Sequence, residues 1–233
     1  PTTFQEGIAD MERNPSFSWR ELRPAMLLLA GLLVVANTGC VGLLANVLYR
    51  GRLAPAACDR LEGKRVAVVC TSNSSDFGPS PNADLIAKGV GILLAENVEE
   101  IEVVAHQKVA AWLDEHDVDF IDHTEIGRAL NVDYVVAIDI ELLRLQDNQT
   151  LYKGNASYRL EVIDITDDGR AVYAPFTPPV IHPKISGVPT TSVTKEHFRR
   201  QFVEVIAGDI ARHFYEHDLN ELVARDRADL DTR

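Results

Sequence analysis

The stretch NVDYVVAIDI, residues 131–140, predicts the strand around which the rest of the chain is arranged. It is nearly continuous in apolar residues, as is typical of a strand whose two faces are both covered. The following segment, residues 156–162, alternates apolar and polar side chains, which predicts a half-buried antiparallel strand. Asp167-Asp168-Gly169 is then a hairpin turn signal, and residues 170–173 begin the return strand.

Upstream of this hairpin, the pattern alternates short strands with helices. The expected strands are RVAVVC at residues 65–70 and a shorter one at 101–104, and the expected helices are 82–97, 107–115 and 124–130. A last helix is expected at 194–215, because apolar residues recur there four apart: Phe198, Phe202, Ile206, Ile210 and Phe214. The predicted class is α/β (α+β-like), a single layered domain whose mixed sheet ends in an antiparallel C-terminal hairpin with flanking helices.

Two stretches of this region resemble a known group of bacterial envelope domains. IGRALNVDYVVAI, residues 126–138, and GNASYRLEVIDITDDG, residues 154–169, are similar to paired motifs of that group. The group includes the curli secretion channel lipoprotein, the lipoprotein activators of penicillin-binding proteins and the amino-terminal domain of the Tol–Pal translocation protein. The resemblance covers residues 64–217. It implies a layered α/β domain that works through protein–protein contacts in the envelope, and it carries no catalytic residues.

The N-terminal part contains a candidate targeting signal. Basic residues precede an apolar run at 26–36, and Thr38-Gly39-Cys40 follows, an order that resembles the export signal and lipobox of bacterial lipoproteins. The resemblance implies that Cys40 carries lipid, although Asn37 departs from the motif. The alternative is an uncleaved anchor helix, because residues 24–49 contain no charge. Both interpretations place the domain at a membrane surface, facing the periplasm. The expected organisation is a signal region (1–40, or an anchor to 49), a linker (41–63), the domain (64–217) and a polar tail (218–233).

Composition excludes some functions and leaves one question about the thiols. A net charge of −12 argues against nucleic acid as a partner. Lipidation of Cys40 would leave two cysteines, Cys58 and Cys70, which could form a disulfide in an oxidising compartment. Alternatively, Cys70 ends an apolar strand and is simply buried.

The sharpest chemical motif lies near the end of the last predicted helix. His213-Phe214-Tyr215-Glu216-His217 matches H-x-x-E-H, an inverted zinc-protease signature in which histidines one helical turn apart bind zinc and the glutamate acts as base. However, Phe214 continues the apolar stripe and turns the histidines to its flank. We therefore expect no metal, no cofactor and no enzyme activity, and a zinc hydrolase is the alternative.

Residues 174–193 contain five prolines and predict a long loop. Its apolar residues predict a partner-binding surface: Phe176, Val180, Ile181, Ile185 and Val188. The alternative is that they pack back on the domain and cover an edge of the sheet. Together these features predict a membrane-anchored, non-enzymatic envelope protein that binds another protein or a cell-wall component. A subunit of an oligomeric envelope assembly, a homo-oligomer, is a further alternative.

Overall fold

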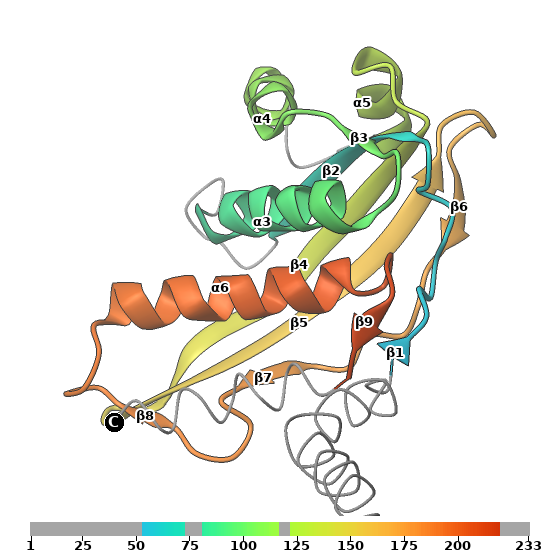
Figure 1. Ribbon diagram of the computed structural model, residues 1–233. Coiled ribbons are helices and arrows are strands. Elements are labelled where there is room, and N and C mark those ends of the chain that lie inside the picture. Colours follow the sequence, from blue (N-terminus) through green and yellow to red (C-terminus); the bar gives the residue numbers. More distant parts are fainter. Residues whose placement is uncertain (1–52, 73–80, 117–121, 220–233) are drawn as a thin grey trace, which may run out of the picture. The chain divides into compact units, whose positions relative to one another are not determined.

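The computed structural model describes residues 53–72, 81–116 and 122–219, which belong to one compact unit, Gly51–Arg233 (Figure 1). Cys40, the expected signal or anchor segment and most of the expected polar tail lie outside these residues. Within the described ranges, no helix is both long enough and apolar enough to span a bilayer.

A mixed sheet forms the centre of the unit, with strand order β3-β2-β4-β5-β6. β2 runs parallel to β3 and β4, whereas β4, β5 and β6 are successively antiparallel. The mixed sheet and its antiparallel C-terminal hairpin therefore confirm the prediction. The strands are β2 (Arg65–Ser72), β3 (Glu102–Val103), β4 (Tyr134–Asn148), β5 (Leu151–Asp164) and β6 (Arg170–Tyr173).

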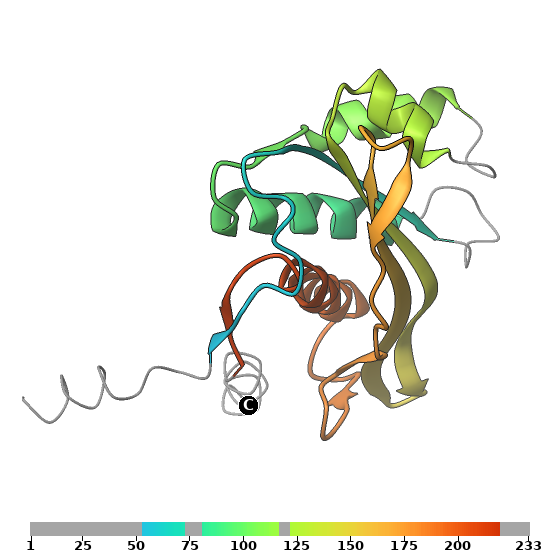
Figure 2. The same cartoon turned by 90° about the vertical axis from the view of Figure 1, so that its right-hand side faces the viewer.

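Four helices flank the sheet within the described residues. α3 (Pro81–Asn97) and α6 (Lys195–Ala211) pack together on one face and enclose the larger core (Figure 2). α4 (His106–Glu115) and α5 (His123–Ala129) contribute to a second, smaller core against the other face. The predicted stripe of α6 is correct, because Phe198, Phe202, Ile206, Ile210 and Phe214 are all buried.

The hairpin of β4 and β5 is longer than the sequence pattern predicts. The predicted apolar run ends at residue 140, but β4 continues through polar residues to Asn148, with register shifts along its pairing to β5. The extension has a physical reason at its far end. Tyr152 and Phe198 stack there with ring centroids 5.2 Å apart, and Leu145 packs against the same small cluster. Tertiary packing by α6 thus stabilises strand beyond the local signal.

The two ends of the unit meet in a short two-stranded sheet of β1 (Leu53–Ala54) and β9 (His217–Asp218). α6 was expected to reach residue 215 but ends at Ala211, since the chain must become extended to pair with β1. Residues expected to form a linker also contact the core. Leu61 is fully buried, and the Cys58 amide donates to the His213 carbonyl at 2.9 Å.

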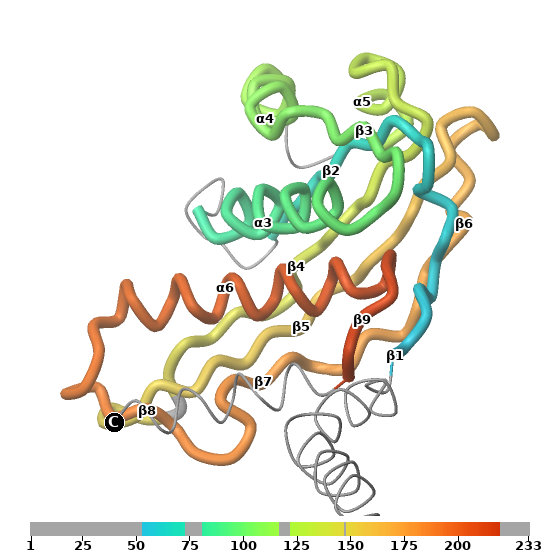
Figure 3. The backbone as a smooth tube through the Cα atoms, viewed as in Figure 1, coloured from blue at the N-terminus to red at the C-terminus, as the bar shows by residue number. Residues whose placement is uncertain are grey.

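The proline-rich segment is not a loop without secondary structure, and this expectation was wrong. It contains β7 (Val180–His182) and β8 (Val188–Pro189), which both pair antiparallel with β5. Figure 3 shows the chain running from β6 through β7 to β8 along β5. β7 and β8 therefore cover this edge of β5, although no local sequence pattern predicts their pairing.

Candidate functional site

The segment 174–193, here called the edge segment, divides its apolar residues between two sides. Val180 and Val188 are buried, so they line the core and are not part of an outward surface. Phe176, Ile181 and Ile185 are exposed, with fractions of 90%, 41% and 85%. Pairing with β5 explains the contrast between Val180 and Ile181, because alternate residues of a strand face opposite sides, whereas Phe176 and Ile185 lie outside the paired residues. Of the five predicted surface residues, three are exposed.

Several contacts hold the edge segment in place. The Thr177 hydroxyl donates to the Tyr158 carbonyl, and the Thr190 amide donates to the Thr150 carbonyl at 2.9 Å. At Gly187 a Cβ atom would lie 3.0 Å from the Leu151 Cβ, so this glycine allows close approach of the segment to β5. The exposed apolar side chains are thus carried by a backbone that is bonded to the sheet.

The H-x-x-E-H residues are not arranged as the zinc signature requires. The motif follows the end of α6, so His213 and His217 do not share a helical face. His213 Nδ1 is hydrogen-bonded to the Tyr173 hydroxyl at 2.8 Å, and His217 Nδ1 donates to the Tyr215 carbonyl at 3.1 Å. Glu216 is exposed. Among the described residues, no group of three metal-ligating side chains converges.

Burial is the main cause of the pKa shifts of two groups near the C-terminal part of α6, His213 and Tyr158. Desolvation lowers the pKa of His213, an effect that Asp209 opposes. The Tyr158 hydroxyl donates to Asp209 Oδ2 at 2.8 Å, and burial raises the pKa of this tyrosine. These hydrogen bonds satisfy polar groups between α6 and the sheet, as expected of a structural layer.

Cys58 and Cys70, the cysteines considered for a disulfide, are both buried and both free. Burial raises the pKa of both thiols, which disfavours the reactive thiolate. Cys70 lies on β2 in the main sheet, whereas Cys58 lies in the segment before it. The pair is not positioned as a reactive centre.

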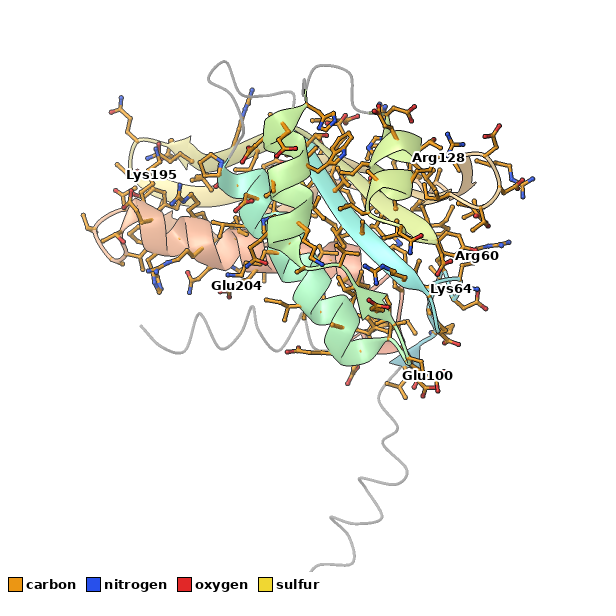
Figure 4. The ribbon with its side chains drawn as sticks, turned by 90° about the horizontal axis from the view of Figure 1, so that it is seen from above. Arg60, Lys64, Glu100, Arg128, Lys195 and Glu204 are labelled. Carbon is orange, nitrogen blue, oxygen red and sulfur yellow. The ribbon has the colours of Figure 1, made fainter. Side chains whose placement is uncertain are left out.

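A groove of about 540 Å³ lies between α3, α6 and the β1–β9 pair. Small residues, Gly89, Ala207 and Gly208, line it together with the side chain of Arg212. Figure 4 shows α3 beside α6 and labels Glu204, another residue that lines the groove. Sequence reasoning missed Arg212, because an arginine near a helix end is usually a solvated capping charge.

Comparison with known proteins gives structural likenesses only. No protein-family model and no curated protein matches the chain. The PelC dodecamer from Paraburkholderia phytofirmans is 15% identical, with a TM-score of 0.42 over 71% of this chain and 97% of that one. Lipoprotein GNA1162 from Neisseria meningitidis is 12% identical, with a TM-score of 0.41 over 63% and 97%. The C-terminal domain of LpoB from Salmonella enterica is 14% identical, with a TM-score of 0.33 over 59% and 91%.

One of these structures is named as a lipoprotein. Scores of this size carry no argument about function. The functional proposal therefore depends on the side chains of this chain.

Proposed function

We propose that this chain is a membrane-anchored, non-enzymatic envelope protein that binds another protein through its edge segment. The observation that carries the proposal is the exposure of Phe176, Ile181 and Ile185 on a segment whose Val180 and Val188 are buried. Water-exposed side chains of this size are favourable to cover, at about 25 cal/mol per Å² of apolar area. The hydrogen bonds to β5 already order the segment, so the entropy cost of ordering it when a partner binds is smaller.

The arrangement also supports binding over catalysis. The histidines of the one catalytic motif are held by Tyr173 and by a backbone carbonyl, and the thiols are buried. A protein partner fits the surface better than a cell-wall glycan, because two of the three exposed side chains are aliphatic, whereas the C–H faces of sugar rings stack on aromatic side chains.

Photo-crosslinking tests the surface directly. A photoreactive phenylalanine analogue is placed at residue 176 or 185 in the full chain, and a matched analogue at Leu85, which is 37% exposed on α3. We expect a discrete protein adduct from 176 and 185 and none from 85. An adduct with a second copy of this chain would show that the partner is the chain itself, in a homo-oligomer. Equal labelling from all three positions would contradict the proposal that the edge segment is the binding surface.

Anchoring is tested at Cys40. If this residue carries lipid, mass spectrometry of the wild type should find Cys40 as a lipidated first residue, and Cys40→Ser should instead leave the full-length precursor. A wild-type protein that keeps its precursor N-terminus and has no lipid on Cys40 would support the uncleaved anchor helix.

A further inference from the structure

Arg212 is a buried cation without an ion-pair partner among the described residues. Its exposed fraction is 8%, and its Nη1 atom is inaccessible to water and makes no hydrogen bond. None of the ion pairs among the described residues includes it. A guanidinium carries five donors and stays charged. Burying it without a partner therefore costs free energy that an apolar side chain at this position would not cost.

The fold aims this side chain into the groove between α3 and α6. Arg212 is the C-cap of α6 and lies one turn beyond Gly208, where a Cβ would come within 3.6 Å of the guanidinium. A Cβ at Gly89 would lie 3.0 Å from the Ala207 Cβ, so small residues bring the two helices close together. The guanidinium therefore lies along a strip of small residues that lines the groove.

The charges around Arg212 narrow the choice of ligand. The carbonyl end of α6 partly compensates the buried cation. Glu204 and Glu216 also line the groove and are exposed, yet neither pairs with Arg212. One buried cation thus lies among acidic side chains, in a chain of net charge −12. A small free anion would be repelled by these carboxylates, whereas a carboxylate carried between basic groups would not.

From this geometry we infer that the groove binds a protein segment that presents a carboxylate between basic residues. The carboxylate pairs with Arg212 through parallel N–H···O bonds. The basic neighbours face Glu204 and Glu216, which selects against purely acidic segments. Aliphatic side chains of the segment contact Leu53 and Ile92, which line the groove and are 49% and 48% exposed. This site is separate from the edge segment and does not depend on it.

A random-peptide display library tests the inference on the full chain in detergent micelles. The library is selected against the wild type, against Arg212→Met, and against Arg200→Met as a matched change at an exposed position of α6. We expect Asp or Glu flanked by Lys or Arg to be enriched on the wild type and on Arg200→Met, and to be lost on Arg212→Met. Absence of this enrichment on the wild type, or its survival on Arg212→Met, overturns the inference.

A labelled peptide from the selection then gives the size of the effect by fluorescence anisotropy. Replacing its acidic residue with the matching amide should raise Kd at least about tenfold on the wild type, because a charge-assisted bidentate pair is lost. The same replacement should have no effect on Arg212→Met. The wild-type comparison remains decisive even if that variant fails to fold, since it needs no change in the protein. Equal affinities of the acid and amide peptides for the wild type contradict the inference.

Discussion

The edge segment and the groove depart from ordinary burial in opposite directions. At the edge, Phe176 and Ile185 are apolar and exposed, although other residues of the segment pair with β5. In the groove, Arg212 is charged and buried, and no described residue pairs with it. A partner at the edge would cover the exposed apolar side chains, and a partner in the groove would pair with the buried charge.

The comparison shows that the two departures have different costs. Exposed aliphatic side chains are common on protein surfaces and change the stability of the free chain little. A buried unpaired cation lowers stability by several kcal/mol unless its surroundings compensate it. Substitutions in the two regions should therefore differ in sign and size, which the following experiments measure.

Phe202→Ala should have the largest effect and should damage both regions. Phe202 is fully buried on α6, and a Cβ at Gly154 of β5 would lie 2.6 Å from its ring, so the two residues are in close contact. Gly154 in turn pairs with His182 of β7. We expect a loss of about 3–5 kcal/mol in the free energy of unfolding, measured with denaturant. Phe202→Leu, which keeps most of the volume, should lose less. A loss below 1 kcal/mol would show that α6 and the edge are not coupled through this contact.

Arg212→Met should raise the free energy of unfolding by about 1–3 kcal/mol, because an unpaired buried charge is replaced by an apolar chain of similar length. Denaturant unfolding of the variant beside Arg200→Met measures it, and the exposed site should change by less than about 0.5 kcal/mol. A clear loss of stability on Arg212→Met would mean that the guanidinium is structural, and the contrast with the edge segment would disappear.

Mild acid should weaken the packing beneath α6 through His213. Burial lowers the pKa of this histidine in the folded state, so the unfolded state binds the proton more readily. The stabilising contribution is complete above the unfolded value of about 6.5 and is lost as the pH falls through it towards the folded value. Thermal melting between pH 7.5 and 5.5 should show a falling Tm that His213→Gln makes flatter. His123→Gln should flatten it independently, since burial lowers that pKa too. An unchanged slope in both variants would contradict this account.

Ile181→Asp and Ile185→Asp should have the smallest effect on stability, within about 0.5 kcal/mol, because both side chains already face water. The matched control is Val180→Asp, which places a charge at a buried position of the same strand and should cost at least about 2 kcal/mol. Melting temperature and photo-crosslinking are measured together. Loss of the adduct with an unchanged Tm supports a binding surface, whereas a large fall in Tm would show that the edge residues line the core.

Local pattern was sufficient to predict β2 to β6, apart from the far ends of β4 and β5, and to predict most helices. The apolar run of β2, the alternation along β5 and the Asp167-Asp168-Gly169 turn are short-range signals, and each produced the expected structure. Asp168 and Gly169 have positive φ angles of 55° and 77°, as a turn of this composition requires. The stripe of α6 was correct for the same reason, because helical periodicity depends on neighbours three and four residues away.

Long-range contacts decided the candidate sites. The inward placement of Val180 and Val188, and the outward placement of Ile181, result from pairing with β5. α6 ends at Ala211 and separates the histidines because residues 217–218 pair with residues 53–54, far away in sequence. Arg212 is buried at a groove that residues of α3, α6 and the β1–β9 pair line together, although these elements are far apart in sequence. A sequence states which side chains are apolar or charged, but burial is a property of what packs against them, and that is settled only when the chain has folded.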